Sequence, residues 1–453
     1  MNWLWSAGWL LSIVACASVL SERRAPTATA AWLILLLALP YVGVVTYVLI
    51  GTRKLRRGGG RIRRLQHAEH AAVAAEDALP VDRLLRRLGV PGAVRGNSVR
   101  LLPEARTARL ALIDVIDRAE RELFMLVYHF ECDQVGTEIL DAMTRAAQRG
   151  VALRVMVDDL GSSRLARRGV HALEAAGGRI VRFRPVWFAL LKRAANLRNH
   201  RKIVVADGCR AWSGGRNISN CYLADHAEQN RWLDLSFSLE GPAARVLDEI
   251  CRSDWRFATE ETLPPPPRID LATGGQISTQ IVASGPDQRD DVWHIALIKA
   301  CFEARSRIWI ATPYCVPDDS MMNALLTAAR SGLEVRLIVP RRSDNVLVDF
   351  VGKSYLRELQ RAGVQVRRYD GGMMHAKAVL IDEDIAAIGS ANLDARSFFL
   401  NYEVMAIFHD AEVAEQLARY MTFISTRSSN GTKPVGVLAE MLGNFARILS
   451  PMM

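Results

Sequence analysis

The chain has 453 residues, more than one ordinary domain holds and enough for two or three. Half of the residues are hydrophobic and 23% are charged, which excludes a disordered or fibrous chain. The 58 Lys and Arg residues outnumber the 48 Asp and Glu residues, and a net charge of +10 favours acidic partners such as nucleic acid, anionic lipid or phosphorylated substrates. The seven cysteines are scattered singly and include no C-x-x-C pair. They therefore indicate neither a disulfide framework nor a structural zinc site, and reduced thiols are the simpler interpretation.

Two uncharged, apolar runs open the chain, at 1–21 and 25–52. A helix that crosses a bilayer needs about 20 apolar residues, and both runs are long enough. The sequence therefore predicts a transmembrane hairpin over 1–52, with spans at about 3–21 and 29–50. A cleaved signal peptide is the alternative for the first run, because Ala15-Cys16-Ala17 has the small residues of a cleavage site. No basic residue precedes that run and a second run follows at once, which favours the hairpin.

The basic residues predict the orientation of this hairpin. Only two arginines and one glutamate lie in its turn, whereas a run without acidic residues follows the second span: Arg53, Lys54, Arg56, Arg57, Arg61, Arg63 and Arg64. The positive-inside rule then predicts that everything after the hairpin is cytoplasmic. The same run could hold anionic headgroups, at about 1 kcal/mol per residue.

Residues 53–105 look like a basic tether and a lead-in segment. From about 106 onward, helical and strand patterns alternate: 107–122 and 135–150 predict helices, and 123–130 and 151–159 predict strands. This order is typical of an α/β sheet with helices on its faces.

The pattern then recurs over a whole domain. Residues 146–158 match 328–340, and residues 200–207 match 375–382. We therefore predict two α/β domains, at 106–262 and 277–425. A linker at 263–276 contains four consecutive prolines, which fit neither a helix nor a central strand. The tail at 426–453 predicts a helix, either docked on the domain or lying on the membrane surface.

Each copy carries the pattern H-x-K-x-x-x-x-D and, 17 residues after its histidine, an asparagine in a small-residue turn. The two turns, 213–217 and 388–392, align. A single H-x-K occurs often by chance, but two copies in register within a repeated unit do not. The candidate catalytic residues are His200, Lys202, Asp207, His375, Lys377 and Asp382, supported by Asn217, Asn392 and Ser390. The two aspartates each end a strand, which favours a structural role for them.

An oriented imidazole usually has a carboxylate on its second nitrogen. Glu403, 28 residues after His375, is the candidate in the second copy. In the first copy Glu228 has the same spacing, but the strand that follows Asp234 aligns better with the strand that follows Glu403. We therefore prefer Asp234 and keep Glu228 as the alternative.

These residues resemble the phospholipase D superfamily, whose signature is this doubled motif. The likeness covers nearly the whole chain and narrows to bacterial cardiolipin synthases through NHRKIVVADG, TPYCVPDD, the 375–403 region, the apolar hairpin and the final LSPMM. The resemblance implies two halves related by a pseudo-twofold axis, with both motifs in one cleft. It also implies His200 as the nucleophile and His375 as the general acid, and no metal or other cofactor.

The implied reaction is transphosphatidylation. His200 attacks phosphatidylglycerol and expels glycerol, a phosphohistidine forms, and a second phosphatidylglycerol takes the phosphatidyl group to give cardiolipin. The two lysines and two asparagines would stabilise the phosphate. Arg216, unusual in its turn, could bind a second phosphate, change the acceptor or simply be a solvated surface residue.

Three alternatives share parts of this pattern. A phospholipase D, or a synthase that uses phosphatidylethanolamine or another alcohol, needs the same catalytic residues. A nuclease fits the charge, but nothing in the hairpin suggests nucleic-acid recognition, so we expect no nucleic-acid partner. A membrane scaffold would have no need of two complete motifs. Phosphatidylglycerol and anionic membrane lipids are the predicted partners.

Overall fold

We describe a computed structural model of the chain. It describes residues 2–21, 26–51, 79–163, 165, 167–183, 197–225, 231–265 and 275–432, together with residues 436, 440, 441 and 447. The basic run at 53–64, Glu228 and most of the proline linker and of the tail lie outside these residues.

The first half of the molecule alternates strands and helices as predicted. Its strands are β1 (Val94–Leu102), β2 (Glu122–Val127), β3 (Ala152–Asp158), β4 (Arg179–Phe183), β5 (Ile203–Ala206), β6 (Arg210–Gly214) and β7 (Ser236–Glu240). Its helices are α4 (Pro80–Arg87), α5 (Ala105–Asp117), α6 (Gln134–Gln148), α7 (Arg167–Ala175), α9 (Asn220–Leu223) and α10 (Pro242–Thr259).

The second half repeats this order. Its strands are β8 (Ile277–Ser284), β9 (Arg307–Ala311), β10 (Cys315–Val316), β11 (Glu334–Pro340), β12 (Gln365–Tyr369), β13 (Ala378–Ile381), β14 (Ile385–Gly389), β15 (Leu393–Asp394), β16 (Glu403–His409) and β17 (Ser428–Asn430). Its helices are α11 (Val292–Glu303), α12 (Asp319–Arg330), α13 (Val346–Arg361), α14 (Ala395–Phe399) and α15 (Ala411–Ser425).

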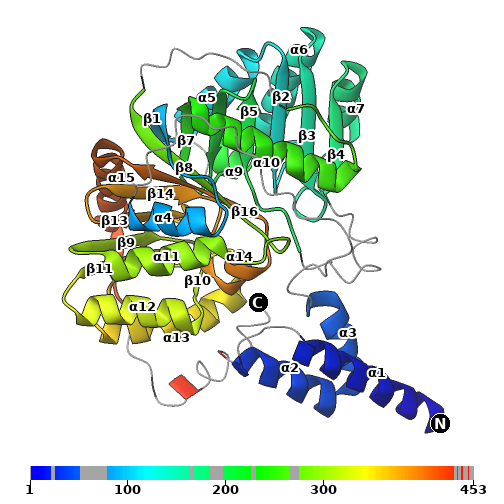
Figure 1. Cartoon of the computed structure of the whole chain (residues 1–453), viewed down its shortest axis with the longest axis vertical. Coiled ribbons are helices and arrows are strands. Elements are labelled where there is room, and N and C mark those ends of the chain that lie inside the picture. The colour runs from blue at the N-terminus through cyan, green and yellow to red at the C-terminus, as the bar shows by residue number, and fades with distance from the viewer. Residues whose placement is uncertain are drawn as a thin grey trace.

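One 15-stranded sheet runs through both halves, in the order β17-β12-β11-β9-β13-β14-β16-β8-β1-β7-β6-β5-β2-β3-β4. Read outward from the β1–β8 pair, the two halves have the same strand order, which confirms the predicted duplication. Figure 1 shows the halves one above the other, with β1, β7 and β8 where they meet.

Helices cover both faces of the sheet, and one face joins the halves. On that face α10 and α15 pack over a single apolar cluster with members from both halves, including Phe237, Trp255 and Phe408. On the other face the two halves have separate clusters, one beneath α5 and α6 and one beneath α11 and α12. The shared cluster makes the junction part of the core and holds the two motifs in a fixed relation.

Two predicted domain boundaries differ from the structure. The second part of the predicted lead-in at 53–105 belongs to the folded domains, and the second domain extends beyond residue 425. Strand β1 pairs with β7 and β8 at the centre of the sheet, and α4 packs on α11. Residues 80–102 are therefore structural rather than a tether. Strand β17 pairs with β12, which extends the second half beyond 425. Arg447 of the tail lies 2.7 Å from Glu358 of α13, a contact that favours the docked alternative for the tail.

The N-terminal runs form three helices rather than the predicted two: α1 (Asn2–Ser21), α2 (Pro26–Ala38) and α3 (Pro40–Ile50). The second run breaks because Pro40 has no N–H and cannot continue α2. The three helices pack together: Ser12 Oγ donates to the carbonyl of Leu36 at 2.9 Å, and Tyr47 donates to Ser18 Oγ at 3.0 Å. Among the residues described, no helix combines the length and the apolar character that crossing a membrane requires.

Candidate active site

The two H-x-K segments lie at the junction of the halves, each directly before a strand of the motif. His200 precedes β5 and His375 precedes β13. The backbone N–H of His200 donates to the carbonyl of Tyr402 at 2.9 Å, and that of His375 donates to the carbonyl of Leu233 at 2.6 Å. Each histidine backbone is thus fixed by the opposite half of the chain.

The carboxylates are also exchanged between the halves. Nδ1 of His200 lies 3.1 Å from both carboxylate oxygens of Glu403, which belongs to the second half. Nδ1 of His375 lies 2.7 Å from Oδ2 of Asp234, which belongs to the first half. The structure brings together all four residues expected here, but pairs each acid with the histidine of the other copy.

The two acids are positioned by different means. Ser390 donates to Glu403 at 2.5 Å and Asn401 donates to it at 3.2 Å. In the first half Gly215 aligns with Ser390, and a Cβ at Gly215 would lie only 2.2 Å from Oδ1 of Asp234. Glycine is therefore required there because the carboxylate occupies the space that a side chain would take.

The lysines are buried beside the histidines rather than exposed in the cavity. Nζ of Lys202 donates to the carbonyl of His200 at 2.7 Å. Nζ of Lys377 donates to the carbonyl of His375 at 2.5 Å and lies 2.8 and 3.0 Å from its two ring nitrogens. Both ammonium groups therefore lie next to the histidines without lining the cavity.

The aspartates of the two motifs are structural, as their positions at strand ends suggested. Asp207 accepts from the backbone N–H groups of residues 120–122, and Asp382 accepts from those of residues 305–307. Both adopt positive φ, 54° and 51°, at the turn after the strand. They fix the turns and do not reach the histidines' cavity.

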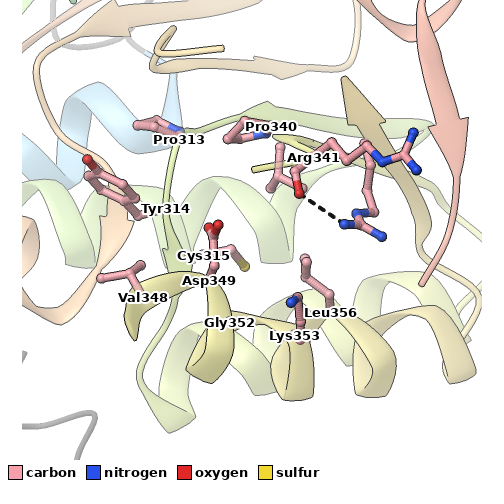
Figure 2. Close-up of a pocket in the computed structure, with 12 residues that line it drawn as sticks. Pro313, Tyr314, Cys315, Pro340, Arg341, Val348, Asp349, Gly352, Lys353 and Leu356 are labelled. Carbon is pink, nitrogen blue, oxygen red and sulfur yellow. Dashed lines mark hydrogen bonds between the residues drawn. The ribbon is translucent and has the colours of Figure 1, made fainter. Parts of the chain in front are cut away.

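His200 and His375 line one cavity of about 540 Å³. Asn217 and Asn392 line it too, and so do Tyr128, Tyr222 and Trp232, which pack against the imidazoles with ring centroids 4.9 to 5.3 Å apart. Oδ1 of Asn217 accepts from the backbone N–H of His129 at 3.2 Å. A smaller pocket of about 30 Å³ adjoins this cavity and shares Tyr314 and Val348 with it (Figure 2).

The charge states follow from burial and from neighbouring charges. Burial lowers the pKa of His200 to about 4 and that of His375 to about 3, the second helped by Lys377. Burial alone would raise the pKa of Glu403 and Asp234, but the hydrogen bond from each histidine partner and the charge of the nearby lysine hold the pKa of both carboxyl groups below the usual range. Burial also lowers the pKa of Lys202 to about 7 and that of Lys377 to about 8. At neutral pH the resting site therefore has neutral imidazoles and charged carboxylates.

Two arginines differ from what their sequence positions suggest. Arg216 neither lines the cavity nor lies on the surface: it is buried and donates to the carbonyls of Leu102 and Pro103 at 2.7 and 2.6 Å. Arg201, the middle residue of H-x-K, was not predicted to matter. Arg201 forms an ion pair with Asp254 at 2.6 Å and donates to the carbonyls of Glu403 and Ser284 at 3.1 and 2.9 Å. Because these two carbonyls belong to the second half, Arg201 links the halves. The only sequence signal was its contrast with Ala376 in the second copy.

Within the described ranges, no group of three or more His, Cys, Asp or Glu side chains is arranged to hold a metal ion.

Comparison with known proteins shows the family to which the chain belongs. A family model described as "Cardiolipin synthase, PLD-like domain" matches residues 112–255 and 297–424, and a "Phospholipase_D-nuclease N-terminal" model matches 10–51. The chain is 32% identical to cardiolipin synthase 1 of Bacillus anthracis, over 98% of this chain and 93% of that protein. It is also 32% identical to cardiolipin synthase A of Klebsiella pneumoniae, over 94% and 93% of the two chains.

Among solved structures, phosphatidylserine synthase of Haemophilus influenzae shares the fold, with a TM-score of 0.63 at 15% identity over 83% of this chain and 100% of that chain. The duplicated sheet and paired motifs define a phospholipase D-like protein. The chain belongs to the cardiolipin synthase family of phospholipase D-like proteins.

Proposed function

We propose that the protein is a cardiolipin synthase that transfers a phosphatidyl group from one phosphatidylglycerol to another and releases glycerol. The observation that carries this proposal is the pair of imidazoles in one cavity, each with a carboxylate on Nδ1, in a chain similar to cardiolipin synthases over nearly its whole length.

In the first step Nε2 of His200 attacks phosphorus, the bond to the glycerol oxygen breaks, and His375 donates a proton to that oxygen. One feature supports His200 as the nucleophile: its Nε2 has no hydrogen bond to any described residue, while Nδ1 lies against Glu403. The bound anion would raise the pKa of His375 and favour the protonated form that donates.

In the second step a glycerol hydroxyl of another phosphatidylglycerol attacks the phosphohistidine. Its proton passes to His375, the P–N bond breaks, and cardiolipin leaves a free His200. Lys202, Lys377, Asn217 and Asn392 would stabilise the charge on the phosphoryl oxygens in both steps. Water must be kept out, because hydrolysis of the intermediate gives phosphatidic acid.

We infer membrane association through the N-terminal helices, with the site on the cytoplasmic side of a bacterial inner membrane. The apolar runs, their match to the N-terminal family model and the basic run after them support this. A lipid-facing opening is supported by Val346 and Leu347 at the start of α13, which are 83% and 53% exposed. Their neighbours Asn345 and Val348 line the cavity.

The test incubates the full chain with phosphatidylglycerol vesicles and chases the reaction with alcohols. Cardiolipin and free glycerol in equal amounts are expected, together with a phosphatidyl-protein adduct that His200→Ala removes. Phosphatidic acid as the only product would instead assign a phospholipase D. Products that carry ethanolamine or another alcohol in preference to cardiolipin would assign a different transphosphatidylase. Lipid turnover that His200→Ala and His375→Ala leave untouched would exclude an enzymatic role for both motifs.

A further inference from the structure

A second pocket, which we call the arm, adjoins the cavity that contains the histidines, and the two meet at Trp232 and Asp344. This arm has a volume of about 600 Å³ and shares Trp232 and Asp344 with the main cavity. Arg231 lines it from the first half and Arg342 from the second half. Neither arginine lines the main cavity, so the arm has its own positive charge.

Both arginines are available to a ligand. Nη1 of Arg231 is buried and has no hydrogen-bond partner among the residues that the structure describes. Within those same residues Arg342 forms no ion pair, whereas the adjacent Arg341 pairs with Asp370 at 2.9 Å. The arm also contains Asp344, whose carboxylate accepts from Tyr314 at 2.5 Å.

The arm lies next to the segment that positions His375, the histidine proposed to exchange a proton with the glycerol oxygen. Arg231 lies three residues before Asp234, which holds His375 at 2.7 Å. Trp232 lies between them and packs against the His375 ring with centroids 5.3 Å apart. The segment is fixed by the backbone bond from Leu233 to the carbonyl of Met373 at 2.8 Å. An anion bound at Arg231 would therefore lie on the His375 side of the cavity.

We propose that Arg231 and Arg342 form the subsite for the phosphate of the acceptor lipid. This inference rests on the proposed function. The hydroxyl that attacks the phosphohistidine must reach His375, and in phosphatidylglycerol that hydroxyl is one glycerol unit from a second phosphodiester. Guanidinium groups suit a phosphodiester because they donate two hydrogen bonds in one plane. The donor lipid has its phosphate at the histidines and leaves this arm free.

The experiment compares two acceptors in one reaction. Full-length protein acts on phosphatidylglycerol in mixed micelles, with labelled glycerol in the water. Labelled phosphatidylglycerol reports transfer to an acceptor without phosphate, and cardiolipin reports transfer to an acceptor with one. In the doubly substituted variant Arg231→Gln/Arg342→Gln we expect the ratio of cardiolipin to labelled phosphatidylglycerol to fall about tenfold or more. The charge-retaining variant Arg231→Lys/Arg342→Lys should restore part of it.

The matched control is Arg330→Gln at the end of α12, an exposed arginine that lines neither the main cavity nor the arm and should leave the ratio unchanged. Continued formation of labelled phosphatidylglycerol shows that the variant is folded and that the chemistry at His200 proceeds. An unchanged ratio, or an equal loss of both products, would overturn the subsite while leaving the synthase function in place. A wild-type protein that makes labelled phosphatidylglycerol but no cardiolipin would overturn the synthase function and, with it, the subsite.

Discussion

Each active-site histidine receives its carboxylate from the other half of the chain. Glu403 orients His200, the proposed nucleophile, and Asp234 orients His375, the proposed acid. The two acids should therefore have different effects when they are neutralised, even though they occupy equivalent places in the repeat.

Glu403→Gln and Asp234→Asn should each lower kcat on phosphatidylglycerol by on the order of 10²–10⁴-fold. A p-nitrophenyl ester of phosphatidic acid separates them, because its leaving group needs no proton. Asp234→Asn should recover much of its activity on this substrate, whereas Glu403→Gln should not. The measurement is the release of nitrophenolate under single-turnover conditions. Recovery by Glu403→Gln instead would reverse the assignment of the two histidines.

The lysines predict the alkaline limit of activity. Because burial lowers the pKa of Lys202 to about 7 and that of Lys377 to about 8, their positive charge is present at lower pH and lost as the pH rises. We expect kcat/KM, which reports the free enzyme, to fall above about pH 7–8. It should also fall below about pH 4, where His200 becomes protonated. In Lys202→Arg any activity that remains should extend to higher pH, since a guanidinium stays charged. A profile that still rises at alkaline pH would contradict this role.

The sequence identified the residues of the site better than their pairing. The spacing of His and Asn in two registers predicted which side chains share a cavity, and the spacing of Lys predicted which cations lie next to the histidines. The exchange of Asp234 and Glu403 could not be predicted, because sequence distance relates an acid only to the histidine of its own copy. The buried state of Arg216 was missed for a similar reason: its partners are the carbonyls of Leu102, the last residue of β1, and of Pro103, in a segment that the sequence analysis assigned to a lead-in.

At the scale of elements, the junction depends on a strand and a buried ion pair that the repeat pattern does not display. Strand β1 has no strong apolar alternation, since Arg95, Asn97 and Arg100 interrupt it, yet it lies at the centre of the sheet. Asn97 is fully buried and bonds to the carbonyls of Val94 and Ile277 at 2.8 and 3.0 Å. A polar side chain is satisfied there by the tertiary structure, which local patterning does not reveal.

Arg201→Met should destabilise the protein strongly, because Asp254 of α10 then stays buried without its ion-pair partner, although it keeps the hydrogen bond from Asn199. We expect the free energy of unfolding to fall by about 3–5 kcal/mol, measured by urea denaturation in detergent micelles. Adding Asp254→Leu should recover part of the loss, since the uncompensated charge is then removed. Arg419→Met is the control: Arg419 pairs on the surface with Glu415, and its loss should change stability by less than about 0.5 kcal/mol. Equal effects of the two substitutions would exclude a role for Arg201 in joining the halves.

At the scale of the whole molecule, the duplicated sheet was predictable because strand and helix patterns recur in order. The N-terminal region was less predictable. Composition predicted one continuous span at 29–50, whereas the structure has two helices, α2 and α3, separated at Pro40. The apolar face at the start of α13 was not predictable either. Val346 and Leu347 look like ordinary helix residues, and only the fold leaves them exposed beside Asn345 and Val348, which line the cavity.

Leu347→Glu should weaken the action on bilayers far more than the action on dissolved short-chain phosphatidylglycerol. The expected loss is about tenfold or more in kcat/KM on vesicles, because burial of one leucine side chain is worth roughly 1.5–3 kcal/mol. Leu110→Glu is the control, since Leu110 is similarly exposed, at 51%, on α5 in the other half. Equal losses on vesicles and on dissolved lipid would show that Leu347 does not contact the membrane.

The reciprocal exchange of acids has a consequence for how such a chain could arise. A polypeptide with only one copy of the motif would keep a histidine but lack the acid that holds it. Two identical copies that face each other would each supply the acid for the other's histidine, and both imidazoles would be oriented at once. Joining the copies end to end then preserves every contact at the junction and frees each copy to diverge. The glycine beside Asp234 and the serine beside Glu403 show that the two copies already differ at equivalent positions, a difference that would let each histidine take the separate role proposed for it.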